Sequence, residues 1–503
     1  MKLIIRNRTA SVEKYGEDGL RRLDESLANL IAADAARGIE TRIVDVDDAR
    51  QMADISSPPV TLRQSAQQLK AAIDGLDKAL NPDFFVLLDG PDILPHVDLR
   101  MPKGLHEDPD PNIPSDLPYA CSAPYSPYPT RYGAVTRVVG RLPAPPADHD
   151  SLGFMLRQID RLVRHKPAAR SDFAVPFALT AKVWDVSTRL SIEKVFGSDR
   201  EVLVSPPSGP SGLDVALGRL PHFINCHGAD SDVQFYGQDD ASMPVALTST
   251  GLAGPVRAGT VAVAECCYGA QLFDPDLTGG TLPIALTYLD QGAVGFLGST
   301  NIAYGPADSN GQADVLTHLF MAGVRRGLTL GRALLEARQE FVRSQSLANP
   351  TNLKTLAQFV LLGDPSIQAC AEAVRRTDLA FAMPELQGLN VKSRAVLKAS
   401  GIAAAGQALY LTGKEIDGNF HLRFDDALDR IAGRYGFSKV KPRVLDVRGG
   451  AVLGRQLKAR METRANVVYC QRIEGAGKSV RIRVLNVAVA NDRLVKIELS
   501  ESR

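Results

Sequence analysis

Two stretches of the sequence place a histidine and a pair of cysteines directly after apolar, strand-like runs. The first stretch reads FINCHG at residues 223–228, and the second reads VAVAECC at residues 261–267. A cysteine nucleophile needs a base nearby to take up its proton and backbone N–H groups to bind the developing oxyanion. Parallel strands end at the same edge of a sheet and lie ~5 Å apart, so we expect His227 and one of the cysteines to share a cleft.

Simpler interpretations exist for each of these residues. A cysteine at a strand end is commonly an inert apolar residue, and a histidine followed by glycine is commonly structural. Cys226, His227, Cys266 and Cys267 could also converge on a metal ion, but they lack the CxxC and HxxxH spacings of zinc sites. A cysteine–histidine dyad stands beside these interpretations because both stretches follow strands of one predicted sheet, and we predict no metal ligands.

The elements that must position these residues alternate along the chain. Helical spacing of apolar residues predicts helices over 19–38, 62–80, 150–165, 187–197, 281–290, 312–325 and 328–346. Short apolar runs predict strands at Thr41–Val46, Phe84–Leu88, Ala134–Val139, Ala178–Val183, Glu201–Val204, His222–Cys226, Thr260–Glu265, Ala293–Gly298 and Phe359–Leu362. The alternation predicts an α/β fold, a mostly parallel sheet with helices on both faces.

Changes in pattern divide the chain into three predicted parts. Residues 1–140 form an N-terminal α/β subdomain, 141–375 a catalytic subdomain, and 376–503 a separate strand-rich domain. Strands of the last part are expected at Ala408–Thr412, Val467–Arg472, Val480–Val487 and Leu494–Leu499. Residues 91–131 are proline-rich and lack periodicity, which is typical of a functional segment or of one between subdomains.

Composition excludes several classes of protein. The chain has 503 residues, of which 45% are hydrophobic and 23% charged, as in ordinary globular proteins. Its net charge of +1 gives no indication of a nucleic-acid or membrane partner. The apolar run before Arg6 is too short for a signal peptide, and the six cysteines do not suggest a disulfide framework. A reduced, cytoplasmic protein is therefore predicted.

The order of the motifs resembles that of the caspase-like cysteine peptidases. A strand followed by His-Gly, and a later strand followed by an acidic residue, any residue and cysteine, is the layout of caspases, metacaspases, legumains, clostripain and gingipains. Further stretches resemble gingipains in particular: FVLLDG at 85–90, SDLPYA at 115–120 with TRVVGRLP at 136–143, GAVGFLGST at 292–300 and LLGDPS at 361–366. The resemblance spans residues 1–375, and it extends to the CHAT branch of the clan, although the N-terminal subdomain favours gingipains.

The resemblance implies a caspase/gingipain-like catalytic unit of two subdomains and a cysteine endopeptidase that acts on proteins or peptides. In this clan an acidic or polar residue lies two positions before the nucleophile, which selects Cys267. The Cys-x-x-Gly spacing of clostripain and gingipains leaves Cys266 as the alternative nucleophile. The resemblance also implies that His227 is the general acid–base and that the N–H groups of Gly228 and Cys267 form the oxyanion hole.

Glu265 is expected, from the resemblance, to line the pocket for the side chain that precedes the cleaved bond. Residues two apart in a strand face the same way, which supports this placement beside the nucleophile. A carboxylate there would favour arginine or lysine, because a unit charge pair at ~4 Å interacts by about 4 kcal/mol at an effective dielectric of ~20. A solvated or ion-paired glutamate is the alternative. Four carboxylates on the loop after the histidine could add to this charge or supply it: Asp230, Asp232, Asp239 and Asp240.

The predicted chemistry requires no metal or redox cofactor. Gingipains bind structural calcium, but no loop here matches a calcium motif, so calcium is left open. Gingipains are also secreted, and the missing export segment favours an intracellular, selective protease. The alternatives are a catalytically inactive binding homologue, and a CHAT-like selective protease or acyl hydrolase that uses the same dyad.

One further carboxylate, Asp364, lies in the sequence Leu-Gly-Asp-Pro. The following proline pushes Asp364 toward extended backbone geometry. Its carboxylate can then accept backbone N–H groups in the manner of an Asx turn. We therefore predict a structural role for Asp364 and not a catalytic one.

Overall fold

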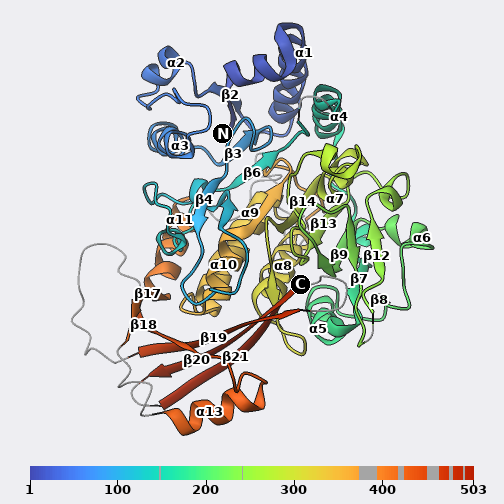
Figure 1. Cartoon of the computed structure of the whole chain (residues 1–503). Helices are drawn as coiled ribbons and strands as arrows, with labels where there is room; N and C mark the ends of the chain where they lie inside the picture. The colour runs from blue at the N-terminus through green and yellow to red at the C-terminus, as the bar shows by residue number, and fades with distance from the viewer. Residues whose placement is uncertain are drawn as a thin grey trace, which may run out of the picture.

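A computed structural model describes residues 1–146, 149–240, 242–372, 394–416, 424–449, 464–474, 480–490 and 493–503. Its main element is a ten-stranded sheet of order β2-β1-β3-β6-β16-β14-β13-β9-β7-β8 (Figure 1). These strands are β1 (Lys2–Arg6), β2 (Thr41–Asp45), β3 (Phe84–Leu88), β6 (Val139–Leu142), β7 (Phe177–Ala181), β8 (Val202–Ser205), β9 (Pro221–Asn225), β13 (Val261–Ala264), β14 (Gly295–Ser299) and β16 (Phe359–Leu362).

The sheet has two halves that run in opposite directions. Strands β2, β1, β3, β6 and β16 are parallel to one another, and so are β14, β13, β9, β7 and β8. The halves meet where β14 pairs antiparallel with β16. The predicted mostly parallel sheet is confirmed. The predicted boundary after residue 140 falls inside β6, so the sheet continues across both predicted subdomains, whose division stays a prediction.

Two groups of helices flank this sheet. The helices of the first 372 residues are α1 (Arg8–Ala36), α2 (Ala49–Asp54), α3 (Ala66–Leu80), α4 (Ser151–Arg164), α5 (Asp185–Phe196), α6 (Asp214–Leu217), α7 (Ile284–Asp290), α8 (Gln312–Arg325), α9 (Leu330–Ser344) and α10 (Pro350–Gln358). On β14, Gly295 faces Leu330 of α9, whereas the adjacent Phe296 packs against Tyr288 of α7. Adjacent strand residues point to opposite faces, so α7 and α9 cover opposite faces of the sheet.

The strand predicted at Ala134–Val139 is wrong in position, because β6 begins only at Val139. The backbone N–H of Arg137 donates to the carbonyl of Ala120 at 3.0 Å, and its guanidinium donates to Asp74 at 2.6 Å. These contacts hold the preceding residues in an irregular path although their side chains alternate like those of a strand.

The proline-rich segment 91–131 contains the hairpin β4 (Val97–Arg100) and β5 (Asn112–Ser115), followed by short 3₁₀ turns. Just after β5, Asp116 accepts two hydrogen bonds from Arg141 of β6, from Nε at 3.0 Å and from Nη2 at 2.7 Å. The two motifs SDLPYA and GRLP are therefore joined by a buried bidentate ion pair.

A second buried ion cluster joins the start of the chain to the Leu-Gly-Asp-Pro turn, and we name Lys2, Asp34 and Asp364 the seam cluster. Lys2 Nζ pairs with Asp34, and with Asp364 at 2.7 Å, and none of the three side chains has exposed area. Asp364 also accepts the backbone N–H of Ser366 at 2.8 Å, as predicted for an Asx-type turn. Burial raises the pKa of Asp364, but Lys2 and Ser366 outweigh it and hold that pKa below its ordinary value.

The strand-rich C-terminal part is also confirmed. Its described elements are α11 (Arg394–Gln407), β17 (Leu409–Glu415), α13 (Asp425–Arg434), β18 (Arg443–Gly449), β19 (Arg464–Glu474), β20 (Val480–Ala490) and β21 (Arg493–Ser502). They form a six-stranded sheet of order β15-β21-β20-β19-β18-β17, in which β15 (Tyr304–Gly305) belongs to the catalytic part. Within the described residues, no helix has both the length and the apolar character needed to cross a membrane.

Candidate active site

The two stretches that carry the predicted dyad lie side by side. Strands β9 and β13 are parallel neighbours, with Ile224 opposite Ala264 in the last pair of their register. Both strands end at the same edge of the sheet, so the segments with His227 and with the two cysteines begin next to each other. The expectation that these strands are neighbours is confirmed.

The two cysteines face different surroundings. Cys266 Sγ accepts the backbone N–H of Cys226 at 3.4 Å, and burial raises its pKa well above the ordinary value. Cys267 Sγ accepts the backbone N–H of Ala303 at 3.3 Å, and burial raises its pKa to about 12. Both thiols are thus protonated near neutral pH, and only Cys267 contacts the segment that leads into β15.

His227 is held by an amide and an indole. Its Nε2 lies 2.6 Å from Oε1 of Gln238, and its ring centroid lies 4.3 Å from that of Trp184. Burial lowers the pKa of His227 to about 4, and the guanidinium of Arg503 acts in the same direction. Because an amide oxygen only accepts, Nε2 carries the proton and Nδ1 keeps its lone pair. Among the described hydrogen bonds, none joins His227 to Cys267.

Gly228 meets the backbone of the second strand end at close range. A Cβ at this position would lie 1.9 Å from the carbonyl oxygen of Cys267, so no larger residue fits. The N–H of Cys267, one of the two donors expected in the oxyanion hole, donates to the carbonyl oxygen of Arg503 at 3.2 Å. The backbone carbonyl of Arg503, which follows β21, therefore lies against this donor.

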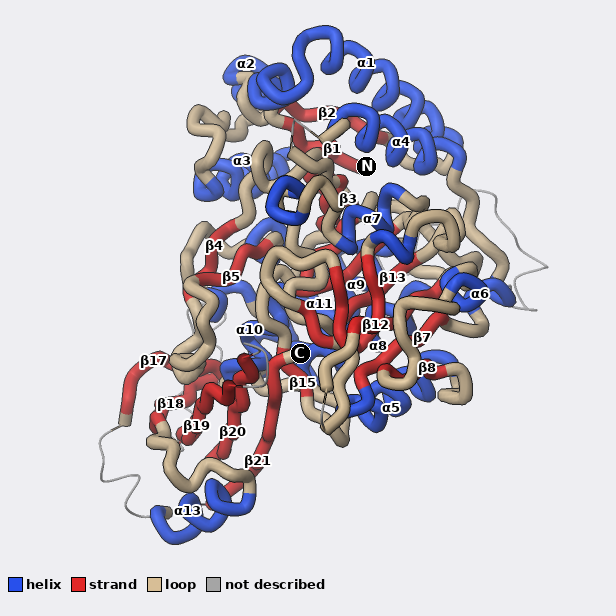
Figure 2. Tube along the Cα trace, turned by 45° about the vertical axis from the view of Figure 1, so that its right-hand side comes forward, coloured by secondary structure: helices blue, strands red, loops and turns tan. Residues whose placement is uncertain are grey.

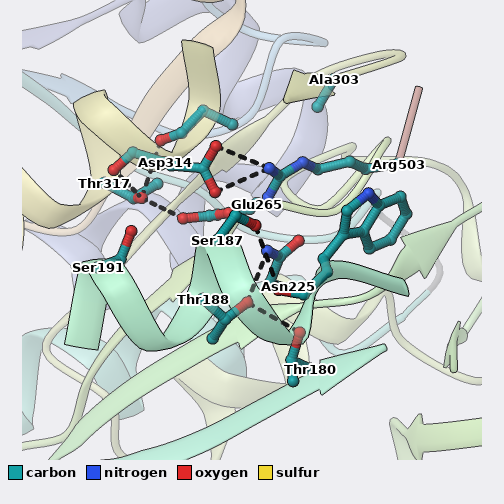
Figure 3. A network of polar contacts seen from close by, with 12 residues as sticks. Thr180, Ser187, Thr188, Ser191, Asn225, Glu265, Ala303, Asp314, Thr317 and Arg503 are labelled. Atoms are coloured by element: carbon teal, nitrogen blue, oxygen red, sulfur yellow. Dashed lines mark hydrogen bonds and ion pairs between the residues drawn. The ribbon is translucent and has the colours of Figure 1, made fainter. Parts of the chain in front are cut away.

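The side chain of Arg503 fills a buried acidic pocket next to the strand end (Figure 3). Its Nη2 donates to both carboxylate oxygens of Asp314, at 2.7 and 2.8 Å, and its Nη1 donates to Glu265. The Trp184 ring lies 5.3 Å from Arg503 Cζ, within cation–π range. We name Glu265, Asp314 and Arg503 the pocket cluster.

The electrostatics of this cluster are those of two buried carboxylates that share one guanidinium. Burial raises the pKa of Glu265 well above its ordinary value, the neighbouring Asp314 adds to this, and Arg503 opposes it. Thr317 of α8 donates to Glu265 at 2.6 Å. Two buried carboxylates repel each other and are costly without a partner charge, and a guanidinium can bind both at once.

The carboxylates of the loop after His227 bind elsewhere. Asp230 accepts from Gln271 at 2.6 Å, and Asp232 accepts from the hydroxyl of Tyr236 at 2.7 Å. Asp239 accepts the N–H of Ser242 at 2.8 Å, and Asp240 is exposed. The ionic partners of Arg503 are Glu265 and Asp314.

The backbone before Arg503 pairs with β15 as an added strand (Figure 2). β21 pairs antiparallel with β15, with Ser502 opposite Tyr304 and Glu501 opposite Gly305. The N–H of Arg503 donates to the carbonyl of Ala303 at 3.0 Å. An extended peptide that pairs with a sheet edge while its side chain enters a pocket is a common mode of peptide recognition.

The segment that forms β15 is supported from beneath by Lys354 and two aspartates. Lys354 Nζ contacts Asp108 at 2.6 Å and Asp110 at 2.8 Å. Asp108 accepts the hydroxyl of Tyr304, and Asp110 accepts the backbone N–H of Ile302 at 2.9 Å. Two aspartates of the proline-rich segment 91–131 thus contact the residues around β15.

Sequence reasoning missed four residues of this site: Trp184, Gln238, Asp314 and Arg503. Asp314 had one local signal, since a carboxylate is favoured in the first turn of a helix, and the Asp314 side chain accepts the backbone N–H of Gly311 at 3.3 Å. Trp184 is the single tryptophan of the chain, which marks it without assigning a role. Arg503 lies 238 residues from Glu265, and no spacing rule connects positions so far apart.

Metal-ligand donors converge elsewhere in the described residues. His149, Asp274 and Asp276 bring one donor atom each within 4.8 Å of one another at the surface. Calcium takes six to eight oxygen ligands, more than these two carboxylates provide, so this group does not fit a calcium site by itself. All six cysteines are free and buried.

The chain is similar to the following known proteins. The model of peptidase family C25 matches residues 226–369, the region that contains both strand ends and α8. A solved structure described as "Structure of Protease" aligns with 99% of this chain and 96% of its own, at 12% identity and a TM-score of 0.46. The Saccharomyces cerevisiae separase–securin complex aligns with 46% of this chain and 14% of its own, at 10% identity and a TM-score of 0.28. No curated protein sequence matches the chain.

The predicted resemblance to gingipain-like peptidases is confirmed by the family match, and with it the caspase/gingipain-like fold class. The matched family is one of cysteine peptidases, which supports a cysteine protease. The roles of individual residues and the preference for a basic residue stay predictions.

Proposed function

We propose that this chain is a cysteine endopeptidase that cleaves proteins after arginine, and less readily after lysine. The observation that carries the proposal is Arg503. Its guanidinium is bound by Glu265 and Asp314 while its carbonyl oxygen accepts the N–H of Cys267. A substrate arginine bound in this way would have its scissile carbonyl next to the thiol. Arginine is favoured over lysine because its planar fork binds carboxylates bidentately.

In the proposed mechanism, Cys267 Sγ attacks the carbonyl carbon of the bound arginine and His227 Nδ1 takes up the thiol proton. The N–H groups of Cys267 and Gly228 stabilise the oxyanion, and His227 then protonates the leaving amine. Water hydrolyses the thioester with His227 as the base. Gln238 supports this role, because its acceptance of the Nε2 proton leaves Nδ1 unprotonated.

The dyad is tested by alanine variants assayed on peptide substrates. Cys267→Ala and His227→Ala should lose cleavage by at least ~10²-fold with unchanged circular dichroism, because each removes a reacting group without adding volume. Cys266→Ala is the matched control and should keep most activity. An inactive Cys266→Ala with an active Cys267→Ala would transfer the nucleophile role to Cys266.

The specificity is tested with a peptide library randomised at the residue before the cleaved bond. The wild type should select arginine, and Glu265→Gln should weaken that selection by about tenfold, which corresponds to ~1.4 kcal/mol. Asp230→Asn is the matched control, since Asp230 binds Gln271 and not Arg503. Selection of acidic or apolar residues would contradict the proposal.

A catalytically inactive binding homologue is the second candidate. One observation favours it: Cys267 is hydrogen-bonded to Ala303 and not to His227, with the thiol fully protonated. Catalytic hydrogen bonds commonly tighten only when substrate binds, so this geometry is also compatible with an enzyme. A protein that binds arginine peptides but cleaves none of the library would establish the binding function.

A further inference from the structure

The end of the C-terminal domain occupies the cleft in which the proposed function requires substrate to bind. Three contacts define the occupant, and each uses a different part of Arg503: the guanidinium in the acidic pocket, the carbonyl oxygen on Cys267 N–H, and the N–H on Ala303 carbonyl. We propose that residues 501–503 act as an intramolecular, substrate-like inhibitor that must leave the site around Cys267 before a protein substrate can enter.

Burial shows that this occupant and a substrate cannot share the site. The Arg503 side chain has no exposed area, and neither do Glu265 and Asp314. β15 consists of the two residues Tyr304 and Gly305, and both pair with β21. A substrate that needs the same pocket and the same strand edge therefore competes directly with the tail.

Residues 501 and 502 are also held by the neighbouring strand of the C-terminal sheet. Ser502 Oγ accepts the N–H of Ile482 at 2.9 Å, and Arg483 Nε donates to Glu501 at 2.7 Å. Both partners belong to β20, the neighbour of β21 in the C-terminal sheet. The C-terminal domain thus delivers Arg503 to the pocket, and Figure 1 shows β21 running from that sheet to the centre of the catalytic part.

Trp184 offers a readout that does not depend on catalysis. It is the single tryptophan of the chain, and its ring lies 5.3 Å from Arg503 Cζ. Its fluorescence should therefore change when a guanidinium enters or leaves the pocket. This inference rests on the proposed function. Peptide binding measured through Trp184 fluorescence tests the occupied site, whereas peptide cleavage tests the proposed enzyme activity.

The experiment compares wild type with Arg503→Gln, and with Arg493→Gln as the matched control at the exposed start of the same strand. The probe is the blocked peptide acetyl-Glu-Ser-Arg-amide, which repeats the tail, with acetyl-Glu-Ser-Gln-amide as the ligand control. Arg503→Gln should bind the arginine peptide at least about tenfold more tightly than wild type and Arg493→Gln, because the competing occupant is lost. It should also cleave an arginine–coumarin substrate faster by a similar factor.

Equal peptide affinity and equal Trp184 emission in wild type and Arg503→Gln would overturn the inference and leave the proposed function standing. If Arg503→Gln bound the arginine peptide tightly but hydrolysed no peptide, the proposed function would be wrong. The inference that residues 501–503 occupy a peptide-binding site would remain. Arg503→Lys keeps the positive charge but loses the bidentate fork. Its affinity for the arginine peptide should therefore lie between those of wild type and Arg503→Gln. It serves as the test if the glutamine variant does not fold.

Discussion

The molecule contains two buried clusters of one cation and two carboxylates, and the clusters differ in where the cation lies. The seam cluster and the pocket cluster each hold one cation against two carboxylates, and none of the six side chains has exposed area. In the seam cluster, Lys2 lies on β1, between β2 and β3 in the main sheet. In the pocket cluster, Arg503 follows β21, which meets the catalytic part through the short strand β15.

The carboxylates of both clusters accept further hydrogen bonds, so the clusters differ at the cation, where Lys2 Nζ also contacts the hydroxyl of Ser366 at 3.3 Å. In the seam cluster, Asp34 accepts the hydroxyl of Thr41 at 2.8 Å, and Asp364 accepts both the N–H and the hydroxyl of Ser366. In the pocket cluster, the Nε of Arg503 has no hydrogen-bond partner. The difference places the cation of the seam cluster on an interior strand of the main sheet and that of the pocket cluster on a segment joined to it by the two residues of β15. Under the proposed function, the first cluster is architectural and the second is a recognition site whose cation a substrate arginine replaces.

The largest expected difference is in stability. Lys2→Met leaves two buried carboxylates without a counter-charge and should lower the free energy of unfolding by ~3–5 kcal/mol. Arg503→Met should cost clearly less, because withdrawal of the tail admits water to the pocket and lets Glu265 bind a proton. Urea unfolding followed by circular dichroism measures both. Equal losses in the two variants would remove the distinction between the clusters.

The second prediction exchanges one carboxylate in each cluster for its amide. Asp364→Asn should lower stability by about 2 kcal/mol, since a buried charged acceptor is lost, while kcat/KM for peptides stays unchanged. In the Arg503→Gln background, where the competing guanidinium is absent, Asp314→Asn should raise KM for arginine peptides about tenfold, and the amide oxygen can still accept the N–H of Gly311. A well-folded Asp364→Asn with a large loss of turnover would instead make Asp364 functional.

The third prediction concerns protonation. Burial lowers the pKa of both His227 and His222 to about 4, so both imidazoles stay neutral down to that pH. In Arg503→Gln, the pKa of His227 should rise by ~1 or more toward 6.5, because water enters and a positive charge leaves. His222, buried on β9 against Tyr288, is the internal control and should not move. NMR titration of histidine-labelled protein measures both pKa values. An unchanged pKa of His227 in Arg503→Gln would contradict an influence of Arg503 on His227.

The smallest effect is expected at the rim of the tail. Arg483 and Glu501 form an ion pair with about a fifth of each side chain exposed, at 20% and 23%. Such pairs contribute ~0.2–1 kcal/mol, so Glu501→Gln should speed peptide cleavage several-fold at most. Arg483→Gln should give the same increase, and added salt should reduce the difference from wild type. An effect as large as that of Arg503→Gln would show that the pocket is not the main anchor.

The sequence predicted the elements whose signal is local. Strands β3 and β16 and helix α8 were predicted at their observed bounds, because wholly apolar runs and helical periodicity depend only on neighbouring residues. The region at Ala134–Val139 alternates like a strand but is held irregular by contacts with Ala120 and Asp74, which lie elsewhere in the chain. Tertiary contacts override local preference there.

The residues of the candidate site also separate into those with a local sequence signal and those placed by tertiary contacts. The neighbouring strand ends followed from the α/β pattern, and the prediction that Glu265 lines a pocket used the alternation of strand side chains together with the resemblance. Asp314 and Trp184 enter the pocket from other elements, and their positions depend on how helices pack on the sheet. Arg503 comes from a domain with no diagnostic motif, so its place in the cleft could not be read from the sequence.

The pairing of β21 with β15 fixes the register in which Arg503 enters the pocket cluster. Successive side chains of a strand point to opposite faces, so a slip of β21 by one residue would turn Ser502 toward the pocket and Arg503 away from it. No partial slip keeps both the guanidinium and the carbonyl in place. Because the guanidinium and the carbonyl leave together, a substrate would meet, under the proposed inhibition, either a fully occupied site or an empty one.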